Sequence, residues 1–303
     1  NLSSQISLHR VSPRYYRPEN AFEKSVLTRL EKIPTDIYES VEEGANYIAR
    51  EIAQTIREKQ KAGRFCVLAL PGGDSPRHVY TELIRMHKEE GLSFRNVIVF
   101  NMYEYYPLAP DAVNSNFNAL KNMLLDHIDI DKQNIFTPNG SIAKDTIFEY
   151  CRLYEQRIES FGGIDIALLG IGRVGNIAFN EPGSSLTSRT RQKTLTTDTI
   201  IANSRFFDND INKVPKTALT VGVGTVLSAK EVMIIVNGHN KARALYHAVE
   251  GSITQMWTIS ALQMHEKGII VCDDAATEEL KVGTYRYFKD IEAGHLDPES
   301  LIK

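Results

Sequence analysis

The sequence predicts an α/β protein built on an open, mostly parallel β-sheet with helices on both faces. Short apolar runs alternate along the chain with longer segments in which apolar residues recur every three or four positions. The short runs have the character of buried parallel strands, and the spacing in the longer segments is that of amphipathic helices. Strands that alternate with helices usually pair in parallel, because each helix carries the chain back across one face of the sheet.

The expected elements follow one another in a regular order. We expect strands at 37–38, 65–70, 97–100, 164–169, 232–236 and 269–272. We expect helices at 41–61, 76–90, 116–127, 145–160 and 241–249, and a closing helix that ends at 288. Ser75 is expected to be the N-cap of the second helix, with Pro76 at its first position and Gly91 at its end. A glycine-rich turn at 221–224 should join a further strand to a helix, and 183–215 reads as a long polar segment.

The chain is long enough for one large domain or two ordinary ones, at 303 residues. No linker rich in proline, serine and glycine divides it, and no internal repeat is visible. We therefore expect a single domain over 34–303, preceded by an N-terminal extension over 1–33. Within that extension, 22–33 has helical spacing and is expected to be a surface arm or an oligomer contact.

The composition excludes several classes of function. A net charge of −3 gives no basic face for nucleic acid, and no apolar run reaches the roughly 20 residues of a membrane helix. The first residues lack the pattern of a signal peptide. Cys66, Cys151 and Cys272 are far apart, odd in number and expected to be reduced, which favours a cytoplasmic protein. No cysteine and histidine spacing suggests zinc, so no metal is expected.

The most informative stretch runs from Ile164 to Pro182. An apolar strand is followed by Gly170, Gly172 and Gly175, and then by Asn180 and Glu181. Glycines directly after a buried strand allow a sharp turn and a close approach of the backbone to a ligand. Ligands of open α/β sheets bind at the carboxyl edge of the strands, so we expect a site here.

Several motifs resemble the glucosamine-6-phosphate deaminase family over roughly residues 34–290. They are 164–182, Leu70-Pro-Gly-Gly-Asp-Ser-Pro76, Phe100-Asn-Met-Tyr-Glu-Tyr105, 184–195, 202–208, 218–225 and Met256-Trp-Thr-Ile-Ser260. The resemblance implies a Rossmann-like fold of the sugar-phosphate isomerase type. It also implies amino-sugar metabolism, a small-molecule sugar phosphate as ligand, no organic cofactor, and a homo-oligomer, either a hexamer or a trimer.

A phosphate cradle is expected after the strand at 65–70. Backbone amides at a strand-to-helix turn favour an anion, although two glycines after a strand are often only a turn. By resemblance, Gly72, Gly73 and Ser75 fall on the family's phosphate loop, and Arg205 and Lys241 match its phosphate-binding cations. Asp74 stands where the family usually has glycine, and its carboxylate would repel a phosphate unless it points away.

The catalytic positions of the family are substituted here. Family members convert glucosamine 6-phosphate into fructose 6-phosphate and ammonia, which requires a carboxylate base at C2 and a histidine for ring opening. By resemblance, Tyr103 stands at the base position, Val174 at an aspartate position and Asn176 at the histidine position. Glu181 alone remains of the expected acid–base set.

Two substitutes for the missing base are conceivable. Glu104 or Glu181 could act as base, or Tyr103 could be activated by the nearby cation Arg173. Aromatic packing is the simpler explanation for at least two of Tyr103, Tyr105 and Tyr106. An unperturbed tyrosine has a pKa near 10 and is a poor base at neutral pH.

A second site is also implied by the resemblance. Ser184, Arg191, Lys193 and Thr194 match positions that bind N-acetylglucosamine 6-phosphate in allosteric bacterial members, and their cations and hydroxyls suit a phosphate. A solvated polar loop is the alternative. The family's allosteric site also uses the N-terminal amine, which the extension over 1–33 would displace.

Three functions remain on the basis of sequence. The leading one is a deaminase-like protein that binds an amino-sugar phosphate. The family resemblance alone favours enzyme activity of the deaminase type, whereas the substituted catalytic positions favour weak, altered or absent deaminase activity. The alternatives are a sugar-phosphate-binding pseudoenzyme or regulatory protein, and, more weakly, a 6-phosphogluconolactonase-like hydrolase.

Overall fold

The computed structural model of the protein describes residues 33–292, and its centre is a parallel sheet. Within this range seven strands pair in parallel. Their spatial order is β1 (Thr35–Tyr38), β10 (Gly268–Asp273), β9 (Glu231–Val236), β6 (Ile166–Gly170), β2 (Cys66–Leu70), β3 (Val97–Asn101) and β5 (Ile135–Phe136). The prediction of an open, mostly parallel α/β sheet is therefore confirmed.

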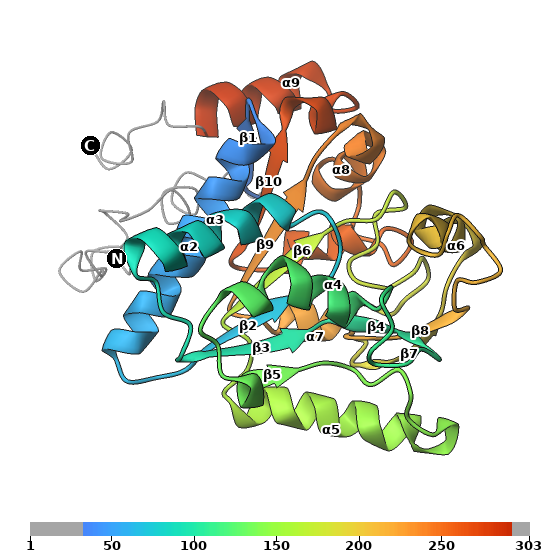
Figure 1. The fold of residues 1–303 in the computed structure, drawn as a ribbon. Coiled ribbons are helices and arrows are strands. Elements are labelled where there is room, and N and C mark those ends of the chain that lie inside the picture. Colours follow the sequence, from blue (N-terminus) through green and yellow to red (C-terminus); the bar gives the residue numbers. More distant parts are fainter. Residues whose placement is uncertain (1–32, 293–303) are drawn as a thin grey trace, which may run out of the picture.

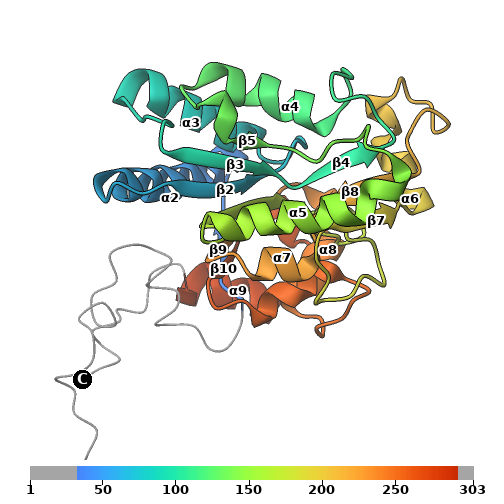
Figure 2. The same ribbon diagram turned by 90° about the horizontal axis from the view of Figure 1, so that it is seen from below.

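Helices cover both faces of this sheet, as Figure 2 shows. One face carries α2 (Val41–Lys61), α3 (Arg77–Glu90) and α4 (Asn116–Met123). The other carries α5 (Ile147–Ser160), α7 (Val223–Leu227), α8 (Ala242–Val249) and α9 (Val282–Arg286). Short 3₁₀ turns complete the connections at Leu125–His127, Lys132–Asn134, Lys144–Thr146, Ser204–Phe206, His239–Lys241, Thr258–Met264 and Asp274–Thr277, and a π-helical turn spans Tyr287–Glu292.

The alternation of side chains along each strand divides the core into two layers. In β2, Cys66, Leu68 and Leu70 face α2 and α3, whereas Val67 and Ala69 face the opposite layer. Every residue of β2 is buried, which explains why the strand is apolar throughout rather than alternating. The three cysteines of the chain, Cys66, Cys151 and Cys272, are free and buried.

A second, smaller sheet lies beyond the carboxyl ends of the parallel strands (Figure 1). Its antiparallel strands are ordered β4 (Tyr103–Tyr106), β8 (Thr217–Thr220) and β7 (Arg191–Thr194). The helix α6 (Thr197–Asn203) follows β7 directly. Neither β7 nor α6 was predicted, and both fall in the segment expected to be polar. The four residues of β7, Arg-Gln-Lys-Thr, have no apolar alternation.

Some predicted boundaries were wrong. Ser75 is not the N-cap of α3, because the helix begins at Arg77 after Pro76 and has no side-chain cap. The expected helix at 116–127 ends as α4 at Met123 and continues only as a 3₁₀ turn. Gly91 does end α3, in the left-handed conformation with φ of 69°. The helix expected at 22–33 lies outside the described residues except for its last position.

No helix within residues 33–292 combines the length and apolar content that crossing a bilayer requires.

Candidate active site

The carboxyl ends of β2 and β6 mark the place in the sheet where a ligand crevice is expected, and the predicted phosphate loop begins there. The two strands are neighbours, with Leu68 opposite Ile166 and Ala69 opposite Ala167. β2 leads into α3 on one face of the sheet, whereas the chain after β6 returns through α7 on the other face. Such a reversal opens a crevice at the carboxyl edge, where open α/β sheets bind ligands.

The loop after β2 is held close to its neighbours. A Cβ on Gly72 would lie 2.0 Å from the carbonyl oxygen of Asn116, so no other residue fits there without a shift. The Oγ of Ser75 lies 2.5 Å from the Cβ position of Gly170, at the end of β6. The predicted phosphate loop and the glycine-rich stretch after β6 are therefore in contact.

Cations collect at the same edge. The Nζ of Lys241 donates a hydrogen bond to the carbonyl oxygen of Ile171, 2.7 Å away. Burial, assisted by the positive charges of Arg173 and Arg205, lowers the pKa of Lys241 to about 8. Lys241 and Arg205 are thus close enough to influence one another, as a shared phosphate site requires.

Asp74 does not point away from these cations. Its Oδ2 lies 3.2 Å from Nη2 of Arg205, and its Oδ1 lies 2.9 Å from Nη2 of Arg77. Ion pairs with these two cations hold the Asp74 carboxylate at the loop, so the expected conflict with a phosphate remains. Arg77 was not singled out from the sequence, although its position three residues after Asp74 is a usable signal.

Tyr103 lies at the start of β4, beside the loop that follows β2. Its ring packs edge-on against Phe179, with centroids 4.7 Å apart, and its hydroxyl lies 3.3 Å from the Cβ position of Gly73. Burial, together with the charge of Glu104, raises the pKa of Tyr103 well above its ordinary value, and the Gly73 amide offsets only part of this. An activated phenolate would need the opposite shift.

Glu104 has a structural role. Its Oε1 accepts hydrogen bonds from the backbone amides of Tyr105 at 2.9 Å and Asn116 at 3.0 Å, and its Oε2 accepts one from Phe117 at 2.9 Å. The carboxylate thereby satisfies amides at the first turn of α4, and it is 2% exposed. Burial raises its pKa against the opposing effect of these amides. This geometry argues against Glu104 as the replacement base.

The side chain at the expected histidine position turns back into its own loop. The Nδ2 of Asn176 donates to the carbonyl oxygen of Ala178 at 3.1 Å, and its Oδ1 lies 1.8 Å from the Cβ position of Gly172. Asn176 is buried, Val174 is half-buried, and Arg173 is exposed. Neither Val174 nor Asn176 offers a group that exchanges protons near neutral pH.

Glu181 is buried and held by two hydroxyls. Thr196 donates to Oε2 at 2.8 Å, and Thr199 donates to Oε1 at 2.7 Å. The carboxylate is 1% exposed. Neither threonine was predicted from the sequence. Thr196 is the N-cap of α6 and Thr199 lies three residues further along, so their hydroxyls are neighbours.

The predicted allosteric residues divide between two environments. Ser184 donates to the carbonyl oxygen of Glu181 at 2.7 Å, and Arg191 donates to Oδ1 of Asn180 at 2.9 Å. Burial lowers the pKa of Arg191 and also that of Lys193, to which the charge of Arg191 contributes. Thr194 is exposed on the opposite face of β7 from Arg191 and Lys193. Arg191 and Lys193 share one face of β7, and the second site stays a prediction.

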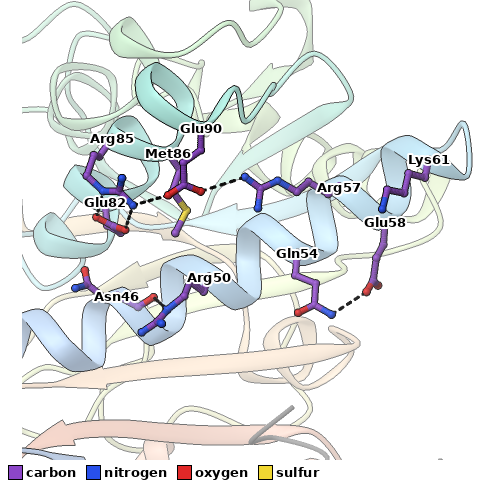
Figure 3. Close-up of a pocket in the computed structure, with 10 residues that line it drawn as sticks. All are labelled: Asn46, Arg50, Gln54, Arg57, Glu58, Lys61, Glu82, Arg85, Met86 and Glu90. Atoms are coloured by element: carbon purple, nitrogen blue, oxygen red, sulfur yellow. Dashed lines mark hydrogen bonds and ion pairs between the residues drawn. The ribbon is translucent and has the colours of Figure 1, made fainter. Parts of the chain in front are cut away.

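A groove elsewhere on the surface is not part of this site. It lies between α2 and α3 and is drawn in Figure 3. Its charged side chains are paired with one another, Arg85 with Glu82 and Glu90, and Arg57 also with Glu90. Because this groove lies by the end of α2 that leads into β2, it is remote from the carboxyl edge.

A family model described as glucosamine-6-phosphate isomerases/6-phosphogluconolactonase matches residues 39–271. A Bacteroides thetaiotaomicron protein named glucosamine-6-phosphate deaminase is 68% identical over 267 residues, covering 88% of this chain and 97% of that protein. Another protein of that organism, named putative glucosamine-6-phosphate deaminase-like protein, is 73% identical over 280 residues. This match covers 92% of the chain but only 42% of that relative, so the chain spans less than half of the longer protein.

Solved structures also resemble the fold. A structure described as a monomeric glucosamine-6-phosphate deaminase has a TM-score of 0.76 and 40% identity, covering 80% of this chain and 98% of that one. A 6-phosphogluconolactonase from Trypanosoma brucei has a TM-score of 0.66, covering 82% of this chain and 99% of that one. At 18% identity, the second match speaks for the fold alone.

Proposed function

Because the chain belongs to the glucosamine-6-phosphate isomerase/6-phosphogluconolactonase family, we propose that it binds an amino-sugar phosphate in the crevice between β2 and β6. The ligand we favour is glucosamine 6-phosphate, because relatives with 58–73% identity are named as deaminases, or deaminase-like proteins, of this compound. We further propose that deaminase turnover is greatly reduced. On this proposal the chain is a deaminase-like protein that keeps its binding site and has lost most of its catalytic activity.

The contrast between two groups of side chains carries this proposal. Ser75 lies against Gly170, Lys241 donates to the neighbouring Ile171, and Arg205 pairs with Asp74 in the loop that holds Gly72 and Gly73; these contacts support a shared phosphate site. The three substituted catalytic positions, in contrast, hold a half-buried tyrosine, a half-buried valine and a buried asparagine.

The chemistry of the family explains why these substitutions matter. Deamination needs a proton taken from C2, a proton exchanged on the ring oxygen, and a proton returned before the amine leaves. Tyr103 stays protonated at neutral pH because its pKa is raised. Each lost acid–base role typically costs about 10²- to 10⁴-fold in rate.

The test combines binding with turnover. Glucosamine 6-phosphate should raise the melting temperature in a saturable way, since a ligand that binds only the folded state stabilises it. Ammonia and fructose 6-phosphate should form at a rate at least about 100-fold below the roughly 10 s⁻¹ of a typical enzyme. Arg205→Ala should weaken the thermal shift, whereas Arg152→Ala on α5 should leave it unchanged. Absence of any shift with wild-type protein would overturn the proposal.

The second candidate is an active deaminase that uses Glu181 as its acid–base group. Two observations favour it: 68% identity to a protein named as a deaminase, and a carboxylate held firmly by Thr196 and Thr199. If this candidate is right, wild-type protein turns over at ordinary rates and Glu181→Gln lowers the rate at least about 100-fold. Glu149→Gln, which removes an exposed carboxylate from α5, is the matched control.

A lactonase function is less well supported, because the lactonase structures share only 15–20% identity with this chain. We keep a single domain over 34–303, a cytoplasmic location and a homo-oligomer as proposals. The solved relative at 40% identity is described as monomeric, so light scattering on the purified chain is the direct check of assembly.

A further inference from the structure

Arg205, the cation that the proposed function assigns to phosphate, already has an anionic partner within the protein. Its Nη2 lies 3.2 Å from Oδ2 of Asp74, and its side chain is 62% exposed. Asp74 stands in the phosphate loop itself, between Gly73 and Ser75. A phosphate that binds Arg205 must therefore displace this carboxylate or lie beside it.

Asp74 is anchored on its other side. Its Oδ1 lies 2.9 Å from Nη2 of Arg77, the first residue of α3. The backbone amide of Arg77 also donates to the carbonyl oxygen of Asp74 at 3.1 Å. If the contact with Arg205 breaks, the carboxylate keeps Arg77 as partner and remains at the mouth of the crevice.

We propose that Asp74 is a tethered counter-anion that competes with phosphate for Arg205 and so sets the affinity of the site. The inference rests on the proposed function, because it assumes that phosphate binds at this loop. An exposed ion pair contributes little to stability, so Arg205 can leave Asp74 readily. The charge of the retained carboxylate nevertheless repels a phosphate dianion.

The proposal predicts tighter phosphate binding when the charge of Asp74 is removed. Asp74→Asn keeps the shape of the side chain and should lower the dissociation constant for inorganic phosphate and for glucosamine 6-phosphate roughly tenfold at low salt. Because exposed charges are screened, the difference from wild type should shrink in about 0.5 M salt. Asp74→Ser is the second variant and should change affinity in the same direction.

Glu149→Gln is a matched control. Glu149 pairs with Arg152 on the exposed face of α5, at 2.9 Å and with the same spacing of three residues as Asp74 and Arg77. The control removes the same charge from the protein without touching the crevice. It should leave the dissociation constant within about twofold of wild type, since screening weakens remote charges.

Isothermal titration of inorganic phosphate and glucosamine 6-phosphate into the three variants and wild type distinguishes the outcomes. Tighter binding by both Asp74 variants, lost on adding Arg205→Ala, supports the inference. If wild type binds and the Asp74 variants bind equally or more weakly, the inference fails while the proposed function stands. An equal gain in phosphate affinity in Glu149→Gln would also overturn the inference. If neither wild type nor the Asp74 variants bind, the proposed function itself fails.

Discussion

Lys241 donates a hydrogen bond from Nζ to the backbone carbonyl of Ile171, 2.7 Å away, and so ties the turn before α8 to the loop that follows β6. The contact joins two segments 70 residues apart in the sequence. It places an amine of lowered pKa beside the glycine-rich loop, with Arg173 and Arg205 close enough to affect it.

The lowered pKa of Lys241 makes phosphate binding pH-dependent. The amine titrates at about 8, because burial and then the charges of Arg173 and Arg205 disfavour its ammonium form. A bound phosphate favours the ammonium form again, so binding should take up a proton and affinity should fall as the pH rises above about 8. Calorimetry with inorganic phosphate in buffers of different ionisation enthalpy should give nearly one proton taken up at pH 9. No uptake at that pH would contradict the assignment.

Lys241 also makes the free energy of unfolding depend on pH, in a direction that its pKa fixes. Its folded pKa lies below the value of 10.5 for a free lysine, so the unfolded chain binds more protons between about pH 8 and pH 10.5. The contribution of Lys241 to the free energy of unfolding therefore rises with pH in this window. Lys241→Met should remove that rise, which urea unfolding at pH 8 and pH 10 can measure.

Glu104 should matter for stability rather than for turnover. The Glu104 carboxylate accepts hydrogen bonds from the backbone amides of Tyr105, Asn116 and Phe117. A Gln side chain would turn its NH₂ group, which is itself a donor, toward at least one of these amides. We expect Glu104→Gln to lower the free energy of unfolding by about 1–3 kcal/mol. Chemical denaturation measures this, with Glu149→Gln as the control. An unchanged midpoint together with a changed ligand affinity would show that Glu104 belongs to the binding site instead.

Gly72 is expected to be intolerant of any side chain. A Cβ there would lie 2.0 Å from the carbonyl oxygen of Asn116, so Gly72→Ala must push the phosphate loop away from α4. We expect a loss of about 1–3 kcal/mol in stability and weaker phosphate binding. Gly283→Ala in α9 is the control, because no atom lies within 4 Å of its Cβ position, and it should be neutral or stabilising.

Restoring the family's catalytic residues should restore turnover. The triple change Tyr103→Asp, Val174→Asp and Asn176→His supplies the base, the carboxylate and the histidine that the family resemblance assigns to these positions. We expect ammonia release from glucosamine 6-phosphate to rise at least about 100-fold over wild type. A folded triple variant that binds the sugar phosphate without this gain would show that further residues limit the chemistry.

The parallel sheet was predictable because its strands are locally distinctive. β2, β3 and β10 are apolar runs bounded by polar or glycine-containing segments, and β6 leads straight into the glycines at its carboxyl end. The small antiparallel sheet was not predictable in this way. Its strand β4 pairs with β8 more than a hundred residues later, and β7, which also pairs with β8, consists of polar residues that are half-buried or exposed.

The site shows the same division between local and long-range information. The residue types at 72–75 indicated an anion loop, and the contact of Asp74 with Arg77 could have been read from their spacing. The ion pair between Asp74 and Arg205 could not, because the two residues are far apart in the sequence and come together only in the fold. Ser75 illustrates the converse error: its sequence context is that of an N-cap, but its hydroxyl lies against Gly170 because β6 runs beside β2.

The most direct test of the account measures binding and turnover on one preparation of wild-type protein. Calorimetric titration with glucosamine 6-phosphate should give saturable binding, while the ammonia assay on the same sample gives a rate at least about 100-fold below the roughly 10 s⁻¹ of a typical enzyme. Turnover at an ordinary rate would contradict the claim that the chemistry is lost. Absence of binding would contradict the claim that the phosphate cradle is intact.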